Sequence, residues 1–273
     1  MKIAGMSDIH GILEQSKLME EVDILCIPGD WSPLELQRCV SSKDKGGTMK
    51  QWIRKKFLPW LLELPAKHIV LSPGNHDFVT ERPWFKEWFN ELLRDTEHDD
   101  RIHYLCNEVK EIAGLKIWGC PCSDLPMWAW FSEFTKDSYT PPEPVDIMLV
   151  HTAPQWGGMG RTFTRWNGFQ DFGSNHLTNA LTSLEHLPKL LFCGHIHGGD
   201  HNPYIYGSKE TGECLMLNVT IKDEDYMEFW DPTVVDYNVC ESRLDYAMST
   251  RRYINGRLEY TRLDIIHNRP LES

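Results

Sequence analysis

The sequence predicts a layered α/β fold, and three observations support that prediction. Apolar runs typical of buried strands alternate with segments of helical spacing over the first 77 residues. Polar residues follow each of these strands, and α/β folds bind their ligands at the carboxyl ends of strands. The chain has 273 residues and a hydrophobic content of 41%, so it can bury a sizeable core.

The first half of the chain carries most of this alternation. Strands are expected at 2–6, 22–27 and 67–71, and helices at 12–21, 49–64 and 83–94. Pro59 would kink or split the second helix, because proline lacks a backbone N–H. Short strands at 101–105, 109–112 and 115–119 are typical of a meander that begins a second sheet.

The second half contains more loop. Residues 120–144 are irregular and aromatic, and they either cover the core or wall a substrate pocket. Strands are expected at 146–150, 190–193 and 214–219, with a long loop over 152–173. Ser174 is expected to cap a helix over 175–187. Near the end, alternation around Asn255-Gly256 predicts a β-hairpin. We expect one domain over 1–235 and an extension over 236–273, which either belongs to that domain or contacts another chain.

Charge and cysteine usage narrow the class of protein. The net charge is −12, from 28 basic and 40 acidic residues, which disfavours a nucleic-acid partner. Most of the 8 cysteines lie in apolar runs, so we expect them to be reduced and the protein to be cytoplasmic. The N-terminal residues lack the pattern of a signal peptide, so none is expected. No apolar run approaches the roughly 20 residues of a membrane span, so no membrane partner is expected.

The residues at the strand ends form a set suited to metal binding. Imidazole, carboxylate and one amide oxygen suit Zn, Mn, Fe or a similar divalent ion better than calcium. Residues two apart in a strand share a face, so we expect the first two members, and likewise the last two, to project together. The members are Asp8, His10, Asp30, Asn75, His76, His151, His195 and His197.

Seven of these eight residues suffice for two ions if one carboxylate is shared. Two such cations, bridged by a carboxylate and a hydroxide, screen a phosphoester's charge and generate a nucleophile near neutral pH. The leaving oxygen then needs a proton, and imidazole is the usual donor. His76 adjoins Asn75 and is expected to be that donor instead of a ligand.

The ordered series Asp8-x-His10, Gly29-Asp30, Gly74-Asn75-His76-Asp77, His151 and Gly194-His195-x-His197 resembles the calcineurin-like metallophosphoesterase superfamily. The resemblance implies a four-layer α/β/β/α sandwich with two mixed sheets and two divalent ions (Mn, Fe, Zn or Ni). It implies that Asp8, His10 and His197 bind the first ion, and that Asp30 bridges. It implies that Asn75, His151 and His195 bind the second. His76 would contact phosphate and act as acid, and Asp77 would orient His76 or cap the next helical turn.

The chain departs from phosphoprotein phosphatases, which carry an Asp-Arg pair after Gly-Asp. Here Trp31-Ser32-Pro33 follows Gly29-Asp30, which argues against a protein substrate. Stretches such as Trp118-Gly119-Cys120-Pro121 and Asn218-Val219-Thr220 resemble MPPED-like proteins, which are similar to class III cyclic-nucleotide phosphodiesterases. Because His197 is present, the resemblance implies a competent site.

Three further residues are candidates for substrate contact. Arg161 and Arg165 lie in the loop after His151, and a guanidinium binds two phosphate oxygens at once. The alternative is a solvated loop charge. His201 follows His197 by four residues and either reaches substrate or is an ordinary surface histidine.

The predicted function is a dinuclear metal-dependent phosphoester hydrolase acting on a small phosphodiester or phosphomonoester, nucleotides included. One alternative is a metal-dependent nuclease, which would need a basic track beside the site. The other is a metal-binding regulatory protein with little turnover, which the intact His76 and His197 disfavour.

Overall fold

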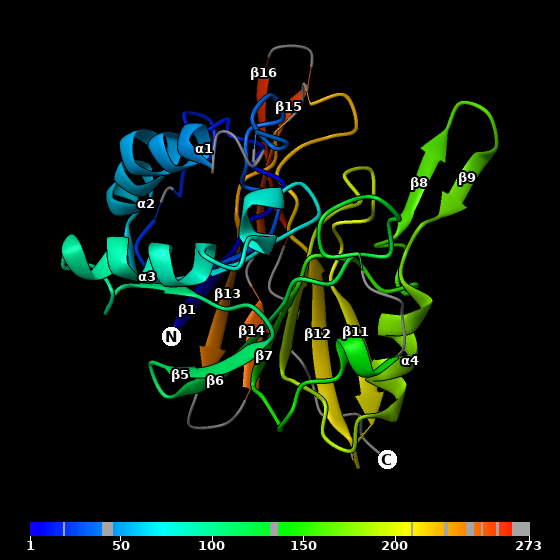
Figure 1. Cartoon of the computed structure of the whole chain (residues 1–273). Coiled ribbons are helices and arrows are strands. Elements are labelled where there is room, and N and C mark those ends of the chain that lie inside the picture. Colours follow the sequence, from blue (N-terminus) through cyan, green and yellow to red (C-terminus); the bar gives the residue numbers. More distant parts are fainter. Residues whose placement is uncertain are drawn as a thin grey trace.

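Two six-stranded sheets pack face to face, and helices cover their outer surfaces (Figure 1). The computed structural model describes residues 1–18, 20–39, 46–131, 136–208, 210–226, 229–238, 243–246, 248–254 and 257–263. Both large sheets mix parallel and antiparallel pairs. The predicted α/β/β/α sandwich with two mixed sheets is therefore confirmed.

The first sheet has the order β14-β13-β1-β2-β3-β4. Strands β1 to β4 are parallel to one another, whereas β13 pairs antiparallel with β1. The bounds are β1 Lys2–Gly5, β2 Val22–Pro28, β3 Ala66–Ser72, β4 Ile102–Tyr104, β13 Thr233–Asn238 and β14 Arg243–Tyr246. Parallel pairing places the carboxyl ends of β1, β2 and β3 at one edge.

The second sheet has the order β11-β12-β10-β7-β6-β5. Strands β6, β7, β10 and β12 run parallel, and antiparallel strands close both edges. The bounds are β5 Glu108–Ile112, β6 Leu115–Cys120, β7 Ile147–Val150, β10 Leu190–Cys193, β11 Tyr204–Ser208 and β12 Gly212–Asn218. Two separate hairpins complete the strands: β8 Arg161–Thr164 with β9 Gly168–Asp171, and β15 Met248–Ile254 with β16 Arg257–Leu263.

Three apolar layers hold the sandwich together. The middle layer joins the inner faces of the sheets, with Ile24 and Val70 from the first sheet and Leu149 and Phe192 from the second. The first sheet's outer face packs on α1 Gly47–Trp52, a π-helical turn Ile53–Phe57, α2 Leu58–Glu63 and α3 Phe85–Asp95. The second sheet's outer face packs on α4 Asn175–Ser183. Short 3-10 turns span Phe78–Glu81 and Lys136–Tyr139.

Several local predictions agree with these elements. Ser174 caps α4, since its Oγ accepts from the Leu177 N–H at 3.0 Å. The predicted helix over 49–64 is interrupted by the π-helical turn, just before Pro59 at the start of α2. Proline offers no N–H to the preceding turn, so a wider turn at this place has a direct physical cause.

The predicted helix over 12–21 is wrong, because its described part consists of a turn, a bend and irregular backbone. The buried Trp60 indole donates to the Ser16 carbonyl at 3.1 Å, which occupies an acceptor that a helix would use internally. The predicted loop over 152–173 contains β8 and β9, and β4 belongs to the first sheet instead of a meander in the second.

The C-terminal region contains the expected antiparallel pair, β15 with β16. The Asn255-Gly256 turn itself lies outside the described residues. Strand β13 crosses residue 235 and pairs with β1, while the division of the chain at that residue stays a prediction. Among the helices that the structure describes, none has the length and apolarity needed to cross a membrane.

His103 on β4 joins the two sheets through hydrogen bonds made by its neutral ring. Its Nδ1 lies 3.0 Å from Lys110 Nζ on β5, and its Nε2 lies 3.3 Å from His68 Nδ1 on β3. Lysine only donates, so Nδ1 accepts and Nε2 carries the proton. Burial, then the charge of Lys110, lower the pKa of His103 to about 4.

Acidification should therefore destabilise the fold through His103. The folded pKa lies below the unfolded one near 6.5, so its contribution is lost as pH falls from about 6.5 towards 4. After allowance for solvent screening we expect a loss of about 1–2 kcal/mol. In urea unfolding, His103→Gln, which supplies the same acceptor and donor, should lose less stability over that range. An unchanged pH dependence in this variant would contradict the assignment.

Candidate metal centre

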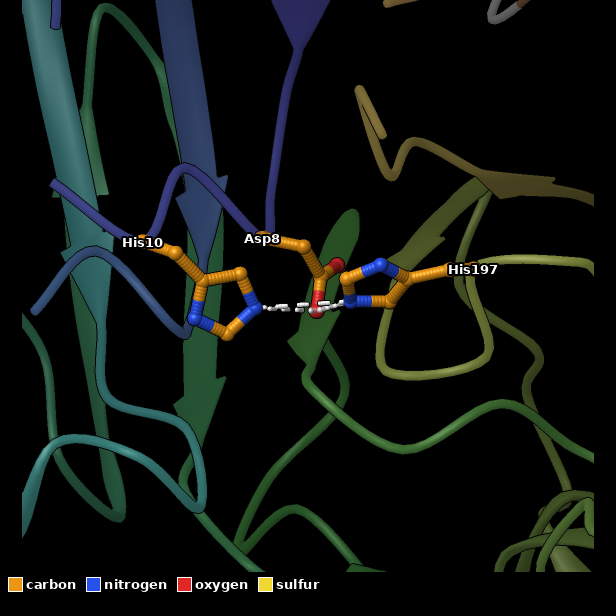
Figure 2. Close-up of side chains that lie close together, drawn as sticks. All are labelled: Asp8, His10 and His197. Carbon is orange, nitrogen blue, oxygen red and sulfur yellow. Dashed lines mark hydrogen bonds and ion pairs between the residues drawn. The ribbon is translucent and has the colours of Figure 1, made fainter. Parts of the chain in front are cut away.

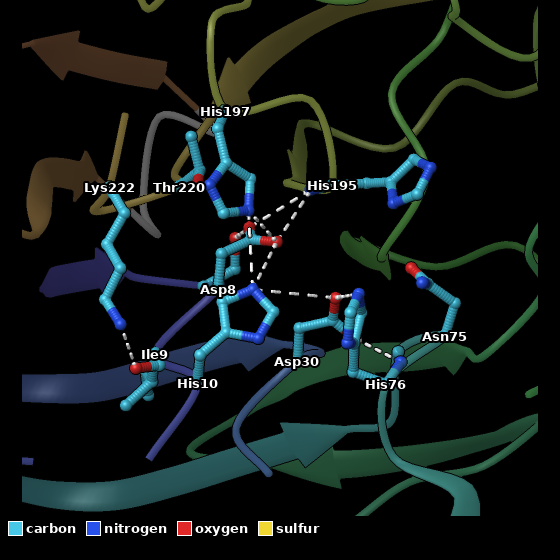
Figure 3. A network of polar contacts seen from close by, with 12 residues as sticks. Asp8, Ile9, His10, Asp30, Asn75, His76, His195, His197, Thr220 and Lys222 are labelled. Atoms are coloured by element: carbon cyan, nitrogen blue, oxygen red, sulfur yellow. Dashed lines mark hydrogen bonds and ion pairs between the residues drawn. The ribbon is translucent and has the colours of Figure 1, made fainter. Parts of the chain in front are cut away.

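Eight predicted site residues lie together where five strands end. The loops after β1, β2 and β3 come from the first sheet, and those after β7 and β10 come from the second (Figure 3). Imidazole, amide and carboxylate side chains from the loops that follow these strands thus meet at the shared edge of the sandwich. The residues brought together are Asp8 and His10, Asp30, Asn75 and His76, His151, and His195 and His197.

Four of these residues have left-handed backbone conformations. Asp8, His10, Asp30 and His195 have φ angles of 58°, 47°, 55° and 69°. Each such conformation costs roughly 1–3 kcal/mol for a non-glycine residue and collects at functional sites. Since β1 ends at Gly5 and β10 ends at Cys193, the prediction that Asp8 and His10, and likewise His195 and His197, lie on one face of a strand is wrong. Strained turns aim them instead.

The first group contains Asp8, His10 and His197 (Figure 2). Asp8 Oδ1 lies 3.2 Å from His197 Nε2 and 4.0 Å from His10 Nε2. The two imidazole Nε2 atoms are 3.4 Å apart. The other carboxylate oxygen of Asp8 accepts from the Ser7 hydroxyl and from the His195 N–H at 3.1 Å. These contacts leave Oδ1 directed at the two imidazoles.

Asp30 connects two further groups. One contains His10, Asp30 and His76, and the other contains Asp30, His151 and His195. Asp30 Oδ2 lies 3.2 Å from His151 Nε2, 3.8 Å from His76 Nε2 and 4.0 Å from His10 Nε2. Its Oδ1 accepts from the His76 backbone N–H at 2.7 Å. The Oδ2 atom of Asp30 is therefore the junction of the cluster.

The orientation of two histidines fits a cation. His197 Nδ1 lies 3.1 Å from the Asp223 carbonyl, and His151 Nδ1 lies 2.9 Å from the Pro28 carbonyl. A carbonyl can only accept, so both Nδ1 atoms carry protons and both Nε2 atoms of the neutral rings present lone pairs. Those lone pairs face carboxylate oxygens, and His151 Nε2 also faces Asn75 Oδ1 at 2.8 Å. Acceptors facing acceptors require a proton or a metal ion between them.

The pKa shifts of the site residues have the same cause, which is the close packing of buried imidazoles and carboxylates. Burial lowers the pKa of His151, but the Asp30 carboxylate outweighs burial and raises it to about 9. Burial likewise opposes the effect of Asp8 on His197, whose pKa is raised. Burial lowers the pKa of His10 to about 3. Burial raises the pKa of the Asp8 and Asp30 carboxyls, but the imidazoles that face them lower it by more, so the net shift is downward. This direction favours the ionised carboxylates, which are the form that binds a divalent cation.

Asp77 is buried beneath the cluster and binds main chain. Its carboxylate accepts from the N–H groups of Asp30 at 2.9 Å, Ser32 at 2.9 Å and Gly74 at 2.8 Å. It makes no hydrogen bond with His76 among the described contacts, and its side chain does not cap the turn Phe78–Glu81. The two roles expected for Asp77 are therefore replaced by a third, which is to hold the loops of Asp30 and Asn75 together.

Asp77→Asn should weaken both the fold and the cluster. An amide nitrogen would face at least one backbone N–H that now donates to oxygen, and an unsatisfied buried donor costs about 1–3 kcal/mol. Metal affinity should fall about tenfold, because the loop that carries Asp30 loosens. Urea unfolding and metal titration measure the two effects. The exposed Asp95→Asn is the control, and equal stability of both variants would contradict this role.

Gln37 and Trp128 lie next to His76, and of these two only Gln37 was outside the predicted candidates. His76 Nδ1 contacts Gln37 Oε1, and the ring packs on Trp128 with centroids 4.5 Å apart. The irregular segment 120–144 thus walls the site at Trp128, whose neighbour Ala129 donates its N–H to the Asn75 carbonyl at 3.1 Å. Gln37 lacked any motif that could have singled it out.

Lys222 and Tyr226 were also missed. Lys222 is fully buried and donates from Nζ to the Ile9 carbonyl at 2.6 Å, between the candidate ligands Asp8 and His10 (Figure 3). Burial lowers the pKa of Lys222 to about 8. The Tyr226 ring lies edge-on to His10 at 5.1 Å and to His197 at 5.0 Å. Their acidic, aromatic stretch gives no ligand signal.

None of the three predicted substrate contacts belongs to these ligand groups. Arg161 is exposed on β8, with its guanidinium 5.0 Å from the Phe169 ring centroid. Arg165 is exposed in the turn between β8 and β9. His201 stacks on Trp230 with centroids 4.3 Å apart. Contact of these residues with a substrate stays a prediction.

Fold and cluster together define a two-sheet α/β domain with a buried His and Asp cluster suited to divalent metal. Residues 1–199 match the profile of the family described as calcineurin-like phosphoesterase. The chain therefore belongs to the calcineurin-like phosphoesterase family, as the ordered motifs predicted.

Two similar proteins illustrate the range of the likeness. UPF0046 protein C25E10.12 of Caenorhabditis elegans is 25% identical over 194 residues, which cover 66% of this chain and 66% of that protein. The crystal structure of a single mutant of Vps29 from Entamoeba histolytica has a TM-score of 0.38 and 11% identity, over 97% of this chain and 99% of that one. Family membership and the buried cluster support a metal-dependent phosphoesterase in general terms.

Proposed function

We propose that this chain hydrolyses small phosphoesters with two divalent metal ions. The observation that carries the proposal is the shared position of Asp30, whose Oδ2 faces His151 on one side and His10 and His76 on the other. Three overlapping groups of potential ligands extend from His197 to His195, and two of them contain Asp30. A single ion needs fewer donors than this cluster offers.

The donors divide into two sets around Asp30. Asp8, His10 and His197 would hold one ion, and Asn75, His151 and His195 would hold the other, with Asp30 shared between them. When bound, such a pair supplies charge neutralisation for the phosphoester and acidifies a water molecule. The carbonyl groups of Asp223 and Pro28 fix the ring orientations of His197 and His151.

His76 would donate a proton to the leaving oxygen. Its Nδ1 contacts the Gln37 amide oxygen, so Nε2 is the atom directed at the cluster. The packing of His76 against Trp128 keeps the ring in that direction. Burial lowers the pKa of His76, which makes its protonated form a stronger acid.

The substrate class follows from charge and from the loop after Asp30. The chain has a net charge of −12, which disfavours long polyanions. The two residues after Asp30 are Trp31 and Ser32, and both are buried. Neither side chain is cationic, so these two positions supply no positive charge to a phosphate at the cluster. We therefore favour a small diester or monoester, nucleotides included, over protein or nucleic acid.

Turnover of chromogenic esters tests the proposal. The protein is stripped with a chelator, dialysed and supplied separately with Mn, Fe, Zn or Ni. Hydrolysis of p-nitrophenyl phosphate and bis-p-nitrophenyl phosphate should appear with at least one metal, and metal analysis should give two ions per chain. Folded protein that binds metal without turning over either ester would instead indicate a metal-binding regulatory protein.

A further inference from the structure

Four large aromatic side chains are exposed on one β-hairpin. This aromatic hairpin, residues 161–172, comprises β8, β9 and the residue after them, and it projects from the body of the molecule (Figure 1). Phe163, Trp166, Phe169 and Phe172 are 61%, 92%, 65% and 48% exposed. Soluble proteins rarely gather so much apolar surface unless something binds there.

The hairpin has two different faces. Register pairs Phe163 with Phe169 and Thr162 with Gln170, so the phenylalanines share one face and Thr162 lies on the other. Thr162 is buried against the body, whereas the Phe163 and Phe169 rings pack on each other with centroids 5.5 Å apart. The apolar face is therefore the outer one, and Trp166 extends it at the tip.

The base of the hairpin is fixed next to the metal centre. Glu224 Oε1 accepts from Thr162 Oγ1 at 2.8 Å and from the Gly198 N–H at 3.0 Å, and Gly198 directly follows His197. The Phe172 N–H donates to the Gly160 carbonyl at 2.8 Å. A surface bound by the hairpin would thus be held close to the His197 loop.

The charge of the hairpin is opposite to that of the chain. Arg161 and Arg165 are exposed, and neither forms an ion pair with a residue that the structure describes. The one acidic side chain, Asp171, accepts from the Gly173 N–H at 2.8 Å. Two unpaired guanidinium groups beside aromatic rings, on a protein of net charge −12, are complementary to an anionic surface.

We propose that the aromatic hairpin docks the protein on an anionic lipid surface. Trp and Phe side chains favour the membrane interface, and arginine stems reach from it to headgroup phosphates. Pairing with a second copy fits less well, because a two-fold contact through this face brings four guanidinium groups together, against two Asp171 carboxylates that already accept from the Gly173 N–H groups. The expectation of no membrane partner came from the length of apolar runs, a criterion that cannot detect aromatics alternating along a hairpin.

Vesicle sedimentation with the full chain tests this proposal. Binding should occur to vesicles of phosphatidylcholine mixed with phosphatidylserine and should be weaker to phosphatidylcholine alone. Trp166→Ser, or Phe163→Ser with Phe169→Ser, should lower the partition coefficient by about tenfold or more. Arg161→Gln with Arg165→Gln should remove the preference for phosphatidylserine. Ile205→Ser, an exposed apolar residue on β11, is the matched control and should bind as the parent does.

Other results of these experiments would overturn the proposal. Parent protein that fails to sediment with either kind of vesicle overturns the proposal. So does vesicle binding that survives both the aromatic and the arginine changes. Sedimentation velocity distinguishes the other occupant, since self-association that Trp166→Ser abolishes, without vesicle binding, would assign the hairpin to a second copy. Circular dichroism confirms that each variant remains folded.

Discussion

Asp30→Ala is expected to lose metal and activity together. Metal content should fall from the proposed two ions per chain to one or none, and turnover should fall by about three orders of magnitude or more. The reason is that Oδ2 of this carboxylate faces His151, His76 and His10 at 3.2–4.0 Å, so its removal takes a donor from both sides of the cluster. Metal analysis after dialysis and ester hydrolysis measure the two losses.

Asp30→Asn separates charge from shape in the same experiment. The amide can still accept from the His76 N–H, which Asp30 Oδ1 now does at 2.7 Å, so the loop should keep its conformation. Metal binding should nevertheless weaken, because the shared negative charge is gone. The control is Asp23→Ala, which removes a surface carboxylate of β2 paired with Lys67 at 2.6 Å. Full activity and two ions in Asp30→Asn would show that no carboxylate is shared.

The sequence predicted which candidate residues lie together better than it predicted the backbone conformation that brings them together. Asp8, Asp30, Asn75 and the histidines were identifiable because they follow apolar strands in a fixed order. Their geometry was not, because alternation along a strand cannot reveal positive φ angles at Asp8, His10, Asp30 and His195. Those angles depend on tertiary bonds such as those of Asp77, which only the folded chain brings together.

The residues that contact the candidate ligands from outside the motifs were not predicted, for the same reason. Each of Gln37, Lys222 and Tyr226 contacts a residue that is distant in the sequence. Gln37 contacts His76, which is 39 positions away, Lys222 contacts Ile9, which is 213 positions away, and Tyr226 contacts His10, which is 216 positions away. No spacing rule links such pairs. The α/β alternation, by contrast, arises from local periodicity, so most strands were located to within two residues. The hairpin of β8 and β9 was missed because glycine, arginine and polar residues hide its alternation.

The His76→Asn variant should keep its metal and hydrolyse esters more slowly. The loss of rate should be larger for esters whose leaving group needs a proton. His76 belongs to one of the three potential ligand groups, so the structure permits a ligand or an acid. An acid matters when the leaving group is a poor one. We expect a loss of about 10²–10⁴-fold for a phenyl or alkyl ester and a much smaller loss for a p-nitrophenyl ester.

Gln37→Leu provides the second half of this test. It removes the acceptor for His76 Nδ1 without touching the cluster, so a smaller loss with the same leaving-group dependence is expected. Gln37→Glu should restore the rate, because a carboxylate also accepts from Nδ1. His186→Asn, at an exposed histidine, should leave every rate unchanged. Equal losses for all esters, together with a lower metal content in His76→Asn, would make His76 a ligand and leave the proton to another group.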